Sequence, residues 1–144
     1  MLVSKKLSFS LALLLLVTNF GCVRLLGAYD PLFTAKFTPI VDEISSIFYH
    51  LEQGVDKPEA QYEQCKPLYT QMKKDLFDLK FHVDALKGDR VEQNQIQPLI
   101  LAMDNMEKIH QLGITSNEAI PALKQPILAA LKAIYVYQAA KQRR

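Results

Sequence analysis

The stretch from Asp30 to Gly54, DPLFTAKFTPIVDEISSIFYHLEQG, decides the fold. It opens with a helix-capping residue followed by a proline, which suits the first helical position. Its apolar residues then recur at spacings of four and three, the period of one helix face. These residues are Phe33, Phe37, Ile40, Ile44, Ile47 and Leu51. The stretch therefore predicts an amphipathic helix over 31–53 that Gly54 ends.

Three further segments, over 57–87, 94–112 and 116–141, repeat this pattern. Two begin with capping-box spacing and two are followed by a glycine, and no alternating run predicts a strand. The boundary residues are Asp56, Glu59, Thr115 and Glu118 at the starts, and Gly88 and Gly113 at the ends. Because short loops join four amphipathic helices, we expect an all-α fold, an up-down-up-down antiparallel four-helix bundle over 30–144.

Each later segment carries its own apolar stripe, and these stripes predict the core. The expected core residues are Tyr69, Met72, Leu76, Leu79, Val83 and Leu86, then Ile96, Leu99, Met103, Met106 and His110, then Leu123, Ile127, Leu131, Ile134 and Gln138. Four prolines lie at least one turn inside these patterns and are expected to kink or interrupt their helices. They are Pro39, Pro67, Pro121 and Pro126, whereas Pro98 is expected in a first turn, where a missing N–H is harmless.

Residues 1–21 have the layout of a bacterial secretory signal. Lys5 and Lys6 precede an apolar run, and Gly21 precedes Cys22 as in the lipobox of lipoproteins, although Asn19 and Phe20 depart from that motif. We expect Cys22 to be lipidated and residues 22–29 to form a tether, with Val23 favouring the outer membrane.

Two other interpretations of the leader remain open. A signal peptidase that cuts near Gly21, or between Gly27 and Ala28, would release a soluble protein. Alternatively the segment stays attached as a membrane anchor, since Leu7 to Val23 is uncharged and near the lower length limit for a spanning helix. All three interpretations place the body outside the cytoplasm, on the periplasmic side of the membrane.

The length and the net charge of the chain exclude some classes of function. The chain has 144 residues, enough for one domain, with 17 Lys plus Arg against 15 Asp plus Glu. Lys5 and Lys6 of the leader account for this excess, so the body is neutral and lacks the basic surface of a nucleic-acid binder. With Cys22 acylated, Cys65 would be the remaining thiol, and we expect it in the core.

The candidate ligand-binding residues are His110, Met103 and Met106, which share one stripe. In an up-down bundle His50 and His110 would lie at one end and His82 at the other, so the three histidines cannot share a metal ion. Glu107 and His110 have the Glu-x-x-His spacing of di-iron bundles, but it occurs once. We therefore expect no metal site, no cofactor and no catalytic residues, since glycine-rich loops and nucleophile motifs are missing as well.

These features predict a non-enzymatic envelope protein, membrane-tethered through Cys22 or an uncleaved leader, whose bundle serves as an accessory or interaction module. At least one of Tyr135, Val136 and Tyr137 must point away from the core stripe and is a candidate contact for a protein partner. The alternative is a periplasmic bundle that binds a small ligand or haem between kinked helices.

The body contains in succession Tyr29-Asp30, Leu51-Glu52, Tyr69, Asp75-Leu76, Leu79, Gln95-Ile96 and Leu99. This succession resembles a family of small bacterial envelope proteins that have a signal peptide and a helical body. It covers most of residues 29–137, and its motifs are mostly structural. The resemblance implies location and fold, and no site residues, since the family has no established activity.

Overall fold

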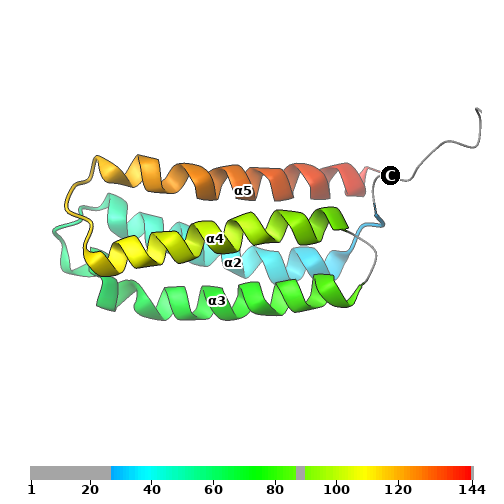
Figure 1. Cartoon of the computed structure of the whole chain (residues 1–144), viewed down its shortest axis with the longest axis horizontal. Helices are drawn as coiled ribbons and strands as arrows, with labels where there is room; N and C mark the ends of the chain where they lie inside the picture. The colour runs from blue at the N-terminus through cyan, green and yellow to red at the C-terminus, as the bar shows by residue number, and fades with distance from the viewer. Residues whose placement is uncertain (1–26, 87–89, 144) are drawn as a thin grey trace, which may run out of the picture.

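The computed structural model describes residues 27–86 and 90–143, and every regular element in these ranges is helical. The predicted leader, Cys22 and Gly88 lie outside the described residues. Four long helices lie side by side as a helical bundle (Figure 1). They are α2 (Pro31–Glu52), α3 (Tyr62–Ala85), α4 (Arg90–Leu112) and α5 (Ala119–Gln142), with a short 3-10 helix, η1 (Pro58–Ala60), before α3.

Helix α2 begins and ends as its sequence predicts. The Asp30 side chain accepts a hydrogen bond from the Leu32 N–H at 2.9 Å, which satisfies one of the free donors of the first turn. At the other end Gly54 has a φ of +133°, in the left-handed region that side chains disfavour. A Cβ there would also lie 2.9 Å from Asp56 Oδ1, so glycine is required at this turn.

The other helix starts differ from the predictions. The segment expected from residue 57 is divided, because η1 precedes α3 and no side chain caps either element. Helix α4 begins at Arg90, one turn before the expected start at 94, and α5 begins at Ala119, three residues after 116. The capping-box prediction for Thr115 was wrong as well, since Ser116 Oγ accepts the Glu118 N–H instead.

Each long helix contains one internal proline, and each continues through it. They are Pro39, Pro67, Pro98 and Pro126, so none marks a break between helices. Two placements correct the predictions. Pro98 is internal because α4 begins early, and Pro121 falls in the first turn of α5, where a missing N–H costs nothing.

The predicted stripes form one core. Every residue of the α2 stripe is buried, and so are the stripes of α3 and α4 except Leu86, which is exposed. In α5, Leu123 is partly buried, whereas Ile127, Leu131, Ile134 and Gln138 are buried. The sequence correctly predicted which face of each helix turns inward, because burial of apolar side chains is the main stabilising contribution to the fold.

The bundle has an entry end, where the chain enters its first long helix, and a loop end, where two loops join the helices. At the entry end Gly27 leads into α2, and the end of α3, the start of α4 and the end of α5 lie beside it (Figure 1). At the loop end, 53–61 joins α2 to α3 and 113–118 joins α4 to α5. Asn117 Oδ1 accepts the Val55 N–H at 3.0 Å, which ties the two loops together.

Helices α2 and α3 pack extensively, whereas α2 and α5 meet largely through long side chains. The rings of Phe37 and Tyr135 lie edge to face, with centroids 5.5 Å apart. Lys124 pairs with Glu52 and lies over the Phe48 ring, with Nζ 5.2 Å from the centroid. Because α5 packs closely on α4 and less closely on α2, much of its surface stays open.

Candidate functional site

His110, the main candidate of the sequence, is buried at the loop end with both ring nitrogens engaged. Nε2 lies 2.8 Å from the Ala60 carbonyl oxygen, and Nδ1 lies 3.1 Å from the Tyr69 hydroxyl. A carbonyl only accepts, so Nε2 carries the proton and Nδ1 accepts from Tyr69 in the neutral ring. Burial lowers the pKa of His110 below its ordinary value, which favours this neutral form.

A polar cluster of α3 and α4 side chains surrounds this histidine. Tyr62 donates to Glu107 Oε1 at 3.2 Å and accepts from Gln111 Nε2 at 2.8 Å. The second carboxylate oxygen of Glu107 pairs with Lys73 Nζ at 2.6 Å. Glu107 is therefore bound by Lys73 and Tyr62. In the described ranges no three His, Cys, Asp or Glu side chains lie close enough together to hold a metal ion.

The structure does not gather the three predicted ligand residues around an opening. Met103 and Met106 are buried in the core, whereas His110 borders a pocket of about 330 Å³ at the loop end that neither methionine lines. The pocket residues are Val55, Ala60, Gln61, Tyr62, Glu63, His110, Gln111, Leu112, Gly113 and Ile114. The opening is thus polar on its α3 and α4 sides and lies beside the two loops.

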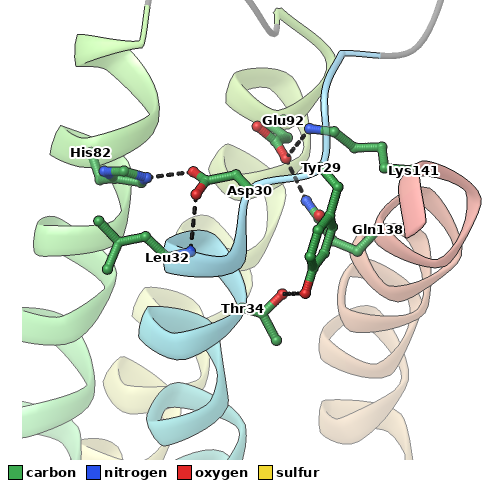
Figure 2. A network of polar contacts seen from close by, with 8 residues as sticks. All are labelled: Tyr29, Asp30, Leu32, Thr34, His82, Glu92, Gln138 and Lys141. Carbon is green, nitrogen blue, oxygen red and sulfur yellow. Dashed lines mark hydrogen bonds and ion pairs between the residues drawn. The ribbon is translucent and has the colours of Figure 1, made fainter. Parts of the chain in front are cut away.

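A second polar network occupies the entry end (Figure 2). His82 Nε2 lies 2.6 Å from Asp30 Oδ2, which joins the end of α3 to the cap of α2. Burial alone would raise the pKa of Asp30, but hydrogen bonds from His82 and the Leu32 N–H outweigh burial and hold that pKa below its usual value. The Tyr29 hydroxyl and Thr34 Oγ1 lie 3.3 Å apart, which fixes the chain just before α2.

The same end contains a buried ion pair between α4 and α5. Glu92 Oε1 accepts from Lys141 Nζ at 2.6 Å and from the side-chain amide of Gln138 (Figure 2). The Lys141 and Glu92 side chains are 1% and 2% exposed, so both charges are removed from water. Sequence reasoning missed this pair. Glu92 lies four residues before Ile96 and Lys141 lies three after Gln138, so each stripe extended by one turn would have found it.

The third candidate is a shallow groove of about 570 Å³ along the outer side of α5, beside α4. Its lining is mostly apolar and consists of Gln95, Ala129, Lys132, Ala133, Val136, Tyr137 and Ala140. Tyr137 is buried and Tyr135 lies against Phe37, whereas Val136 is 62% exposed. Val136 is therefore the residue of the Tyr135–Tyr137 run that lines the groove and faces outward.

Helix α5 is also the one helix in the described ranges that is long and apolar enough to cross a membrane, by length and composition alone. Only 28% of its most apolar window is buried. Because Ile127 and Ile134 pack in the core, the same composition suits a bundle helix whose outer face is uncovered.

Comparison with known proteins gave no relative of this chain: no family model, no curated protein and no solved structure matches it.

Proposed function

We propose that this chain is a membrane-tethered interaction protein of the bacterial cell envelope, with an up-down-up-down four-helix bundle as its body. The leader layout and the Gly21-Cys22 step support the tether. Contacts of the entry end support the topology, because the first residues of α2 and α4 meet the last residues of α3 and α5. Lipidation at Cys22, followed by Val23, would place the body on the periplasmic side of the outer membrane.

The outer groove of α5 is the observation that carries this function. Its alanines leave room for a partner backbone to approach closely, and Val136 offers apolar surface in the middle. Lys132 at the rim supplies a charge that orients the partner. An apolar helix of another envelope protein fits a groove of this shape and chemistry.

The tether is tested by Cys22→Ala. We expect the wild-type chain to incorporate labelled palmitate and to be processed in a globomycin-sensitive way, and the variant to do neither. A mature N-terminus mapped beyond Cys22 would show that the chain is released and would refute the tether.

The docking surface is tested by a photo-crosslinking residue at Val136 in the full chain in native membranes. We expect one discrete cross-linked partner, lost when Ala133→Glu places a charge in the groove. The matched control has the same residue at Thr70, which is exposed on α3. A product of equal yield at both positions would mean that the contact is not specific to the groove.

The loop-end pocket favours a second function, the binding of a small polar ligand. Its lining offers the side chains of Gln61, Tyr62 and Gln111, which suit hydroxyl or amide groups. Haem is a poorer fit, because both nitrogens of His110 already have partners. Native mass spectrometry of chain extracted from membranes tests this candidate: a bound small molecule that is lost in Tyr62→Phe or Gln61→Ala supports it, whereas ligand-free protein of the apo mass contradicts it.

A further inference from the structure

The entry end combines exposed apolar side chains with cations. We propose that this end is seated on an anionic lipid bilayer, tilted so that the outer face of α3 touches the lipid. The proposal rests on the membrane tether of the proposed function and adds a defined contact surface. The membrane-facing surface consists of Leu32, Phe77, Phe81 and Leu86 with Arg90 and Arg143.

The apolar side chains of this surface are large and exposed to solvent. Phe77 and Phe81 are each 68% exposed, and their spacing of four places them on the same side of α3. Leu86 follows at the end of α3, and Leu32 on α2 lies beside His82 of α3 (Figure 2). Phe77 and Phe81 together form an exposed apolar strip of the kind that contacts a membrane or a protein, and Leu86 lies beyond it at the tip of the helix, beside the entry-end pocket.

The charges of the entry end favour an anionic partner. In the described part of the entry end each carboxylate has a basic partner, since Asp30, Asp84 and Glu92 pair with His82, Lys80 and Lys141. Arg90 and Arg143 are exposed, and the described residues supply no ion pair for either. Cations beside exposed apolar side chains fit the headgroups and outer acyl region of an anionic bilayer.

The length of the tether determines which end of the bundle lies near the bilayer. From Cys22 to Gly27 there are five residue steps, which span at most about 18 Å even when fully extended. A 24-residue helix such as α3 is about 35 Å long, so a body held through Cys22 keeps its entry end near the bilayer. Phe77 lies about 12 Å before the end of α3, and tilting the bundle toward α3 brings it to the lipid as well.

The chain contains no tryptophan, which gives a direct test. The full acylated chain, purified from membranes, is reconstituted into phosphatidylethanolamine–phosphatidylglycerol vesicles with a single tryptophan, either Phe81→Trp or Tyr49→Trp. Tyr49 is 61% exposed near the loop end of α2 and is the matched control. We expect brominated acyl chains to quench the emission of Phe81→Trp by roughly half and to leave Tyr49→Trp unchanged, given the shallow depth of interfacial side chains.

Charge variants test the lipid specificity. In the Phe81→Trp background, Arg90→Gln with Arg143→Gln should reduce the quenching, and so should vesicles without phosphatidylglycerol. Lys108→Gln, at an exposed cation near the loop end of α4, should leave it unchanged. Equal quenching in neutral and anionic vesicles would contradict the charge contribution.

The outcomes separate the two proposals. A chain that alkaline carbonate washes off the vesicles overturns the tether and the seated orientation together. If the chain stays attached but Phe81→Trp emits as in water, only the seated orientation is wrong. An emission shifted to the blue that brominated lipid does not quench means that protein covers the apolar strip, and this also overturns the contact with lipid.

Discussion

One carboxylate oxygen of Glu43, Oε2, is buried without a hydrogen-bond partner, and this carboxyl group lies close to Asp75 across the α2–α3 interface. Burial is the largest cause that raises the pKa of Glu43 to about 7, followed by the charge and hydrogen bond of Asp75 and the charge of Asp42, while Lys74 lowers it. The folded protein therefore keeps Glu43 protonated at pH values where the unfolded chain ionises it.

The raised pKa of Glu43 predicts a pH-dependent stability. The stability that protonated Glu43 contributes to the free energy of unfolding is fully present below about pH 4.5. It is lost as the pH rises through about 7. We expect Glu43→Gln to raise the free energy of unfolding at pH 8 by about 1–2 kcal/mol, because solvent screens part of the effect, and to change it little at pH 4.5. Urea unfolding at both pH values measures this, and Glu59→Gln, at an exposed carboxyl group, is the control. If Glu43→Gln raised the free energy of unfolding equally at both pH values, the effect would not come from the ionisation of Glu43.

The Glu92–Lys141 pair predicts an asymmetry between single and double substitutions. Lys141→Met removes a cation from the buried Glu92 carboxylate, and we expect a loss of about 3–5 kcal/mol in the free energy of unfolding. Adding Glu92→Leu removes that charge and should recover most of the loss. Lys132→Met, at an exposed lysine, is the control for the loss of a cation. Additive losses in the double variant would show that the two charges do not depend on each other.

Among the helices, the internal prolines are the locally unfavourable feature. An internal proline removes a hydrogen bond to the carbonyl four residues earlier, which is Asn94 for Pro98. We expect Pro98→Ala to raise the free energy of unfolding by about 1–3 kcal/mol, and Pro121→Ala, in a first turn, to change it by less than about 1 kcal/mol. Thermal and urea unfolding of both variants measure the difference. No gain from Pro98→Ala would mean that the packing around Pro98 offsets the missing hydrogen bond.

Helix identity and inward faces could be predicted from sequence because apolar periodicity records burial directly, as in Phe33, Phe37 and Ile40. Helix starts were harder to predict. Asp56 and Thr115 have the residue types of caps, but the hydrogen bonds at those turns went to other partners. Helix α4 begins at Arg90, and the sequence has a cap-type residue, Asp89, directly before it, which the prediction of a start at 94 overlooked. Contacts between helices, such as His82 with Asp30, depend on packing that no single stripe shows.

The sequence predicted the candidate site in part. It found His110 as a buried polar residue and placed an outward-pointing residue within 135–137, which the structure identifies as Val136, because both follow from periodicity. It did not find that Ala60 and Tyr69 occupy both nitrogens of His110, since these partners are distant along the chain. The grouping of His110 with Met103 and Met106 assumed an opening in the core, whereas the pocket lies at the loops.

At the scale of the whole molecule, Cys65 reports on global unfolding. It lies on α3 and is fully buried, with Sγ 3.5 Å from the carbonyl oxygen of Glu59 in η1, and burial raises its pKa. In Cys22→Ala it is the one remaining thiol. We expect its reaction with a thiol reagent to be slow in the native protein and to accelerate in step with urea unfolding, as followed by circular dichroism. Fast reaction before unfolding would show that the loop end opens locally.

The double use of Asp30 has a mechanical consequence. Its carboxylate caps α2 and also holds His82 of α3, so a pull on the chain from its N-terminal side loads two helices at once. In single-molecule pulling through the N-terminus we expect Asp30→Ala to lower the first rupture force, because α2 alone would then bear the load and peel from its first turn. Through its two contacts, Asp30 would divide a force applied at the N-terminal side between α2 and α3.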